Sequence, residues 1–213
     1  MKTISRLGIA FVILTACAFA QAPGMPQFSA DMKMTNQRMP DGVNGKLFFD
    51  KGKMRMDMNM PQGRGPMGGN VSMIHDTEKK TSYMLMNDQK MYMEMAGGGG
   101  RMGRGPRMPD VKSYDPSNPC ANEEGVTCKK VGEETVNGRD CEKWEFTSTD
   151  ASKNHTSWID KKIHIPVRNV SADSTFDLTN IKEGPQDKSK FEVPSDYQKF
   201  DPASMMGGRG PGR

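Results

Sequence analysis

Residues 53–60 read Lys53-Met54-Arg55-Met56-Asp57-Met58-Asn59-Met60, with a methionine at every second position. Successive side chains of a β-strand point to opposite faces of a sheet, so a strand here would carry all four methionines on one face. The charged and amide side chains would then line the other face. The segment therefore predicts a strand with one apolar, methionine-lined face, and it lacks the periodicity of a helix.

Two turns, one just before this segment and one further along the chain, predict how the methionine-containing strands pair. A two-residue turn at Lys51-Gly52 would place Leu47 and Phe49 opposite methionines, and a turn at 87–90 would place methionines opposite methionines. A one-residue slip would scatter these side chains over both faces. The expected pairs are Phe49 with Met54, Leu47 with Met56, Met86 with Met91, and Met84 with Met93. We therefore predict that the six methionines of these pairs lie on one side of one sheet.

Short segments of alternating polar and apolar residues continue along the chain, separated by turn residues such as Asn137-Gly138. Further strands are expected at residues 28–35, 71–75, 81–86, 91–95, 131–136, 139–148, 155–160, 163–172, 175–182 and 191–194. Many short strands with regular turn signals predict a mainly β fold, a curved antiparallel sheet or open half-barrel with few or no long helices.

The composition limits the class of protein. The chain has 213 residues, which suits one domain, and a net charge of only +4, which argues against a strongly basic nucleic-acid-binding protein. Leu, Ile, Val and Phe together number 32, few enough to suggest disorder, but 20 methionines add to the apolar residues. We therefore expect a core that is built largely from methionine.

The N-terminus has the features of an export signal. Lys2 and Arg6 accompany an apolar run at residues 7–16, which is too short to span a bilayer. Cleavage after Ala18-Phe19-Ala20 would make residues 1–20 the signal peptide. The chain is therefore expected to be periplasmic or secreted.

A second cleavage site is possible. Leu14-Thr15-Ala16-Cys17 resembles a bacterial lipobox. In that case residues 1–16 are removed and Cys17 is lipidated, which would anchor the protein to a membrane as an outer-membrane lipoprotein.

Three segments rich in glycine, arginine and proline each contain one copy of Gly-Arg-Gly-Pro. Such composition does not bury enough apolar surface to order itself. We expect a half-barrel domain at 28–201, preceded by a flexible leader at 21–27, interrupted by disordered loops at 61–70 and 97–109, and followed by a disordered tail at 202–213. An arginine-glycine arm for nucleic acid or anionic lipid is the alternative. Few aromatic residues interleave these arginines, so no nucleic-acid partner is expected.

Three cysteines, Cys120, Cys128 and Cys141, would remain in an oxidising compartment, which leaves one thiol over. A tight Asn137-Gly138 hairpin would place Cys128 opposite Thr147, about 20 Å along the ladder from Cys141 and too far for a disulfide. A Cys120–Cys128 bridge is the better expectation, with Cys141 free or able to reach Cys120. Without a Cys-x-x-Cys spacing, we do not expect a metal site at these thiols.

The methionine face suits an apolar ligand, because thioethers are flexible and polarisable and adapt to variable guests. An apolar small molecule, a lipid or a lipidated partner is the expected occupant. The residues expected to line the face are Met32, Met34, Leu47, Phe49, Met54, Met56, Met58, Met84, Met86, Met91, Met93, Met95, Trp144 and Phe146.

Two other interpretations remain. Thioethers are soft ligands that favour Cu(I), so the face could bind copper or silver, with Met54, Met56, Met91, Met93 and His75 as ligands. Alternatively, methionine simply replaces leucine and valine in the filled core of a structural envelope module. If the face does not bind copper, no cofactor is expected.

A series of stretches resembles a known family. VGEETVNGRDCEKWEF (131–146), SWIDKKIHIPVRNV (157–170), TFDLTNIKEG (175–184) and KFEVPSDYQKF (190–200) follow in order, after GKLFFDKGKMRMDM (45–58) and MIHDTEKKTSYMLMNDQKMYMEM (73–95). This series is similar to the bacterial LolA/LolB-like superfamily of exported half-barrels, particularly its DUF4412 branch. The resemblance covers about residues 28–201. It implies a curved antiparallel sheet with a hydrophobic concave face and a role like that of a lipid or lipoprotein carrier.

No motif of a known enzyme class is present: there is no H-E-x-x-H, G-x-S-x-G, P-loop or Rossmann glycine pattern. His75, His155 and His164 are isolated in sequence, and acidic pairs such as Glu133-Glu134 are typical of solvated turns. We therefore predict no catalytic residues and a protein that is not an enzyme.

Overall fold

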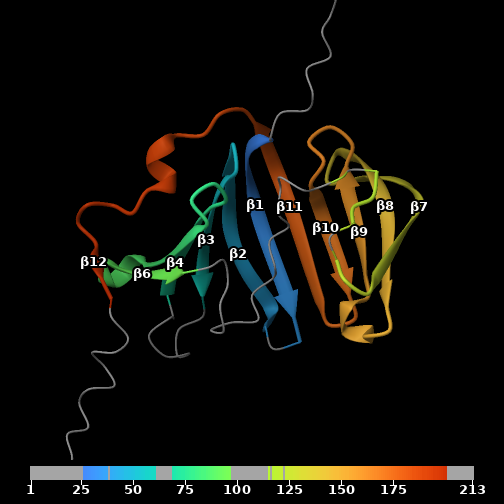
Figure 1. The fold of residues 1–213 in the computed structure, drawn as a ribbon, viewed down its shortest axis with the longest axis horizontal. Coiled ribbons are helices and arrows are strands. Elements are labelled where there is room, and N and C mark those ends of the chain that lie inside the picture. The colour runs from blue at the N-terminus through green and yellow to red at the C-terminus, as the bar shows by residue number, and fades with distance from the viewer. Residues whose placement is uncertain are drawn as a thin grey trace, which may run out of the picture.

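The computed structural model describes residues 26–37, 39–60, 69–96, 115, 117–121 and 123–200. Twelve strands in these residues form one sheet, in the order β12-β6-β5-β4-β3-β2-β1-β11-β10-β9-β8-β7 (Figure 1). Neighbouring strands are antiparallel, except that β12 lies parallel to β6. The strands are β1 (Gln27–Asn36), β2 (Met39–Asp50), β3 (Lys53–Met60), β4 (Gly69–Asp76), β5 (Thr81–Met86), β6 (Met91–Ala96), β7 (Val126–Val136), β8 (Arg139–Ser148), β9 (His155–Asp160), β10 (Pro166–Ser171), β11 (Ser174–Glu183) and β12 (Gln198–Lys199).

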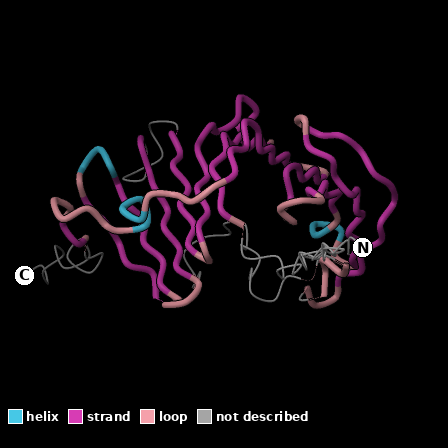
Figure 2. The backbone as a smooth tube through the Cα atoms, turned by 90° about the horizontal axis from the view of Figure 1, so that it is seen from above, coloured by secondary structure: helices cyan, strands magenta, loops and turns pink. Residues whose placement is uncertain are grey.

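The sheet is curved and open, which confirms the predicted fold class. Seen from above, the strands follow an arch rather than a closed ring (Figure 2). Helical structure in the described residues is confined to three short 3-10 turns, η2 (Asn87–Gln89), η3 (Ala151–Lys153) and η4 (Lys188–Phe191). Within that part of the chain, no helix has the length and apolar character needed to cross a bilayer.

The hairpin registers around the methionines are those that the turns predict. Phe49 pairs with Met54 across the turn at Lys51-Gly52, and Met86 pairs with Met91 across η2. Lys51 and Gly52 both have positive φ, at 47° and 81°, as a tight type I′ turn requires. The six predicted methionines therefore lie on one face of the sheet.

One predicted register is wrong, in the hairpin of β7 and β8. Cys128 pairs with Phe146, one residue short of its expected partner. The register shifts between Lys130 and Gly132, where Val131 is an extra residue on β7. Such a β-bulge moves every later residue of the strand to the other face, relative to a regular strand.

The largest core cluster lies on one side of the central strands, which we call the inner face. Phe28 is almost fully buried there and stacks on Phe49, with ring centroids 5.9 Å apart. Ile163, from the turn between β9 and β10, packs into the same cluster as Met54 on distant β3, so this face is the inside of the arch. The cluster consists of Phe28, Ala30, Met32, Leu47, Phe49, Met54, Met56, Ile163 and Leu178.

The C-terminal segment, residues 184–200, packs against the opposite, outer face. Phe191 at the end of η4 is buried against Ile74 and Leu85. Around this contact pack the partly buried side chains of Phe48, Tyr83, Tyr92, Val193 and Tyr197. The half of the sheet that carries the methionines is therefore covered by apolar packing on its outer side.

The strand expected at 191–194 is wrong. Asp187 begins a 3-10 turn instead, and its carboxylate accepts a hydrogen bond from the backbone N–H of Ser189 at 2.9 Å. The chain then crosses the outer face, and only β12 joins the sheet, through N–H groups that donate to carbonyls at the edge of β6.

Two of the expected boundaries between loops and strands differ in the structure. Gly69 and Asn70 were expected in a disordered loop, but they begin β4, and the Asp88 carboxylate accepts hydrogen bonds from the backbone and side chain of Asn70. The strand expected at 163–172 starts only at Pro166. The predicted signal peptide, most of the leader, residues 61–68, the loop 97–109 and the tail 202–213 lie outside the described residues.

Candidate functional site

Methionines of four adjacent strands form an array on the inner face, which we call the methionine surface. Paired residues of β3, β4, β5 and β6 make three rows across these strands. The rows are Met56-Met73-Met84-Met93, Met58-Val71-Met86-Met91 and Met54-His75-Ser82-Met95. Neighbouring strands lie about 4.8 Å apart, so the side chains of one row are neighbours. Sequence reasoning missed Met73, although its alternation with Val71 and His75 could have identified it.

The methionine surface is only partly buried. Met54, Met56 and Met86 are buried, as are Leu47 and Phe49 on β2. The remaining methionines of the surface keep part of their area exposed, and these are Met58, Met73, Met84, Met91, Met93 and Met95. On β1, the predicted residue Met32 is buried and Met34 is partly exposed. The surface therefore merges with the core at one end and remains partly accessible over β4–β6.

Trp144 and Phe146 were expected on the same apolar face but form a separate cluster. They lie on the inner face of β8 and pack with Cys120 and Ile159. Six strand intervals separate β8 from β3 in the sheet. The predicted apolar face is therefore divided into two parts by the strand order.

The predicted copper ligands do not converge on one ion. Met54 and Met56 are on β3, whereas Met91 and Met93 are on β6, three strand intervals or about 14 Å away. His75 lies between Met54 and Ser82 in its row, and its Nδ1 is 2.8 Å from Ser82 Oγ. These five side chains are therefore spread over three strands, whereas a single metal site needs its ligands to meet around the ion.

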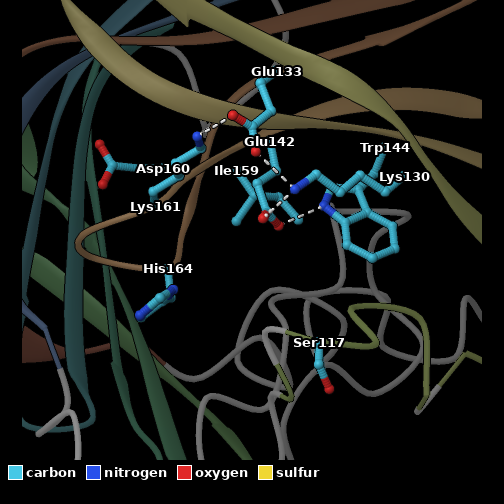
Figure 3. A pocket seen from close by; sticks show the side chains of 9 residues that line it. All are labelled: Ser117, Lys130, Glu133, Glu142, Trp144, Ile159, Asp160, Lys161 and His164. Atoms are coloured by element: carbon cyan, nitrogen blue, oxygen red, sulfur yellow. Dashed lines mark hydrogen bonds and ion pairs between the residues drawn. The ribbon is translucent and has the colours of Figure 1, made fainter.

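A pocket of about 540 Å³ opens on the inner face of β7–β9 (Figure 3). The Lys130 ammonium donates to Glu133 at 2.9 Å and to Glu142 at 2.7 Å, and Lys161 pairs with the second oxygen of Glu133. Trp144 Nε1 donates to Glu142 at 3.2 Å. The pocket is lined by Ser117, Lys130, Glu133, Glu142, Trp144, Ile159, Asp160, Lys161 and His164.

Charges in this pocket neutralise one another. Hydrogen bonds from Lys161 and Lys130 lower the pKa of Glu133 to about 2, so its carboxylate stays ionised at neutral pH. Sequence reasoning took Glu133 for part of a solvated turn. In a regular strand Lys130 and Glu133 would point to opposite faces, but the bulge at Val131 brings both to the inner face. The pocket thus combines an aromatic wall with a network of paired charges.

The disulfide joins Cys120 and Cys128, with Cα atoms 5.9 Å apart. It ties the loop before β7 to that strand, and Cys120 packs on the cluster around Trp144 and Phe146. Cys141 is free and 1% exposed. Burial and the nearby Asp160 charge raise the pKa of the Cys141 thiol to about 11.

We expect Cys141 to react very slowly with thiol reagents in the folded protein. A pKa raised from 9.0 to about 11 reduces the thiolate fraction at neutral pH about 100-fold, and burial blocks access as well. The measurement is the rate of labelling by an aromatic disulfide reagent in native buffer and in denaturant. Fast labelling of the native chain at this one thiol would contradict the buried position.

Residues 28–165 match the family model described as "Domain of unknown function (DUF4412)". In fold, the chain is similar to MucB in the Pseudomonas aeruginosa MucA/MucB complex, with 13% identity, a TM-score of 0.51, and coverage of 83% of this chain and 58% of that chain. A second MucB crystal structure gives 14% identity, a TM-score of 0.51, and coverage of 84% and 61%.

A LolA superfamily protein from Nitrosomonas europaea shares 10% identity, with a TM-score of 0.35 and coverage of 79% of this chain and 90% of that chain. The present chain spans about three fifths of the length of the MucB chains that it matches. At these identities the likeness concerns the fold alone. No curated protein sequence matches the chain.

Proposed function

Because the chain belongs to the DUF4412 family and carries a partly accessible methionine surface inside an open sheet, we propose that it binds an apolar ligand there. The proposed ligand is an acyl chain, either of a free lipid or of a lipidated partner. The protein would act as a binding or carrier protein of the bacterial envelope rather than as an enzyme.

One observation carries this proposal. Three rows of side chains lie on the inner face of β3–β6. All are apolar except His75 and Ser82 in one row, and six methionines in the rows remain partly exposed. A filled core would bury such side chains, because exposed apolar area costs about 25 cal/mol per Å². Thioether side chains adapt their shape to a guest, which suits chains of variable length and saturation.

The proposed location is outside the cytoplasm. A signal-like N-terminus and the disulfide between Cys120 and Cys128 both suit an oxidising compartment. Lipidation at Cys17 would keep the protein at a membrane, whereas cleavage after Ala20 would release it. A protein partner is compatible with this proposal, because MucB, which has a similar fold, forms a complex with MucA.

The test replaces the three methionines of the central row that lie on β4–β6. Changing Met73, Met84 and Met93 together to Leu keeps volume and apolarity, so a fluorescent long-chain fatty acid should bind within about threefold of the parent affinity. Changing the same three residues to Gln keeps the side-chain length but adds polarity. We expect the triple Gln variant to bind the probe at least about tenfold more weakly, because the probe loses apolar contact area.

Copper binding is the competing function, and the same variants separate it. Met84–Met93 and Met86–Met91 are direct neighbours on β5 and β6, so these four thioethers are the ones that could share a Cu(I) ion. Tight Cu(I) binding by the parent that is lost in the triple Leu variant would support the metal function instead. If the parent binds neither the fatty acid nor Cu(I), the proposal is overturned. The interpretation that then remains is a structural module with a filled core.

A further inference from the structure

β7 forms one edge of the sheet. One edge of β7 pairs with β8 along the whole strand. No strand of the described residues pairs with its other edge (Figure 1). An exposed edge presents unpaired backbone N–H and C=O groups, which can pair with a strand of another molecule. The question is therefore which strand this edge would accept.

The charges along the middle of β7 are complementary to themselves. Residues 129–134 read Lys-Lys-Val-Gly-Glu-Glu. When two copies of this segment pair antiparallel about a twofold axis between Val131 and Gly132, Lys130 faces Glu133 of the second copy. Lys129 then faces Glu134, so all four charges of each copy lie across from a charge of opposite sign. Within one copy Lys130 already pairs with Glu133, and Glu134 pairs with Lys143 at 3.6 Å, so these contacts would be shared with the second copy. Opposite charges placed directly across two strands stabilise the pair.

The β-bulge makes this pairing geometrically possible. Directly opposed residues of antiparallel strands share a face, but residues three apart on a regular strand lie on opposite faces. With Val131 as an extra residue, Lys130 and Glu133 both lie on the inner face, beside Trp144 and Glu142 respectively. Lys129 and Glu134 correspondingly share the outer face. A bulge and edge charges usually discourage pairing, whereas here they match a twofold register.

Two further features fit the twofold contact. Val131 is 41% exposed, and it is the one large apolar side chain of the described residues that is exposed. In the pair it would meet Gly132 of the second copy, which leaves room for it, since no atom lies within 4 Å of a Cβ built there. The Lys129 ammonium makes no hydrogen bond or ion pair with any other described residue, so its charge is available to a partner.

We propose that β7 is a homodimer interface, in which two copies of the chain pair their β7 strands antiparallel about the Val131-Gly132 centre and join their sheets. This interface is independent of the methionine surface and of its ligand. It would place the two pockets on β7–β9 on either side of the dimer axis.

The test uses charge reversal and charge exchange in the exported full chain. Sedimentation of the parent should show a monomer–dimer equilibrium. Lys129→Glu alone and Glu134→Lys alone each turn two attractive contacts into two repulsive ones, and each should raise the dimer dissociation constant at least about tenfold. An equimolar mixture of the two variants restores opposite charges at both contacts, so it should dimerise like the parent.

Lys153→Glu, an exposed reversal on η3 with the same change in net charge as Lys129→Glu, is the control and should dimerise normally. Circular dichroism verifies that each variant is folded. Hydrogen exchange should show added protection in the dimer at those amides of residues 129–134 that do not donate to β8. A parent that stays monomeric at every concentration would overturn the proposal. So would a dimer that persists in both reversed variants, or a mixture that stays monomeric.

Discussion

We expect replacement of Arg139 by leucine to destabilise the fold by about 3 kcal/mol, the lower end of the range for breaking a buried ion pair. Arg139 Nε donates to the Asp160 carboxylate, whose side chain is 2% exposed, while Nη1 donates to Glu183 at 2.8 Å. Asp160 also accepts the backbone N–H groups of Lys162 and Ile163, which shapes the turn that inserts Ile163 into the inner-face core. Removing the guanidinium leaves this buried carboxylate without its counter-charge.

The pH dependence of stability identifies the same carboxylate. Burial raises the pKa of Asp160, but the hydrogen bond from Arg139 and those from the backbone of the turn outweigh it, so the pKa lies below 3.8. A group with a depressed folded pKa contributes stability above its unfolded pKa and loses it as pH falls through the folded value. The parent should therefore lose stability below about pH 4, and the leucine variant should lose less over that range.

Urea denaturation between acid and neutral pH measures both effects. The control is Arg168→Leu, since Arg168 also pairs with an aspartate, Asp177 at 2.6 Å, but with a side chain that is 35% exposed. Because this pair is much more accessible to solvent than Arg139–Asp160, its loss should cost about 1 kcal/mol. Equal losses for the two leucine variants would show that burial of Asp160 is not what makes the first pair important.

The second large effect is expected at Phe191. Replacing it with alanine should cost about 3 kcal/mol, because the ring is 8% exposed and packs on two of the most buried residues of the outer face, Ile74 and Leu85. Lys190, its neighbour, accepts a hydrogen bond from Arg55 through its carbonyl at 3.0 Å. Loss of the ring should therefore free residues 188–200 before the rest of the sheet unfolds.

Hydrogen exchange on the alanine variant would detect this as faster exchange at the amides of residues 198 and 200, which donate to the carbonyls of Lys90 and Tyr92. Tyr197→Phe is the matched control. It keeps the aromatic ring and removes only the hydroxyl that donates to Asn87 at 3.0 Å, so it should cost about 1 kcal/mol. Unchanged exchange at the C-terminal segment in the Phe191 variant would contradict a role for this ring in holding it.

Local sequence was enough to predict most of the strands, the tight turns around the methionines and the common face of the methionines. Alternation with a period of two defines a strand face, and a two-residue turn sets the register of its hairpin, so Phe49, Met54, Met84 and Met93 could be paired from the sequence alone. The Cys120–Cys128 disulfide is also present, because it closes a short local loop.

Only the tertiary structure decided which strands that are distant in sequence become neighbours. β1 lies beside β11, with Met32 opposite Leu178, and this order separates Trp144 from the methionines. Gly132 inside the strand is a local signal of a bulge, but it does not show that the bulge brings Lys130 and Glu133 into one pocket. Residues 191–194 alternate like a strand, but Phe191 is buried against Ile74 and Leu85 on the outer face. In each case a contact between segments far apart in the chain outweighs a local preference, and periodicity carries no information about such contacts.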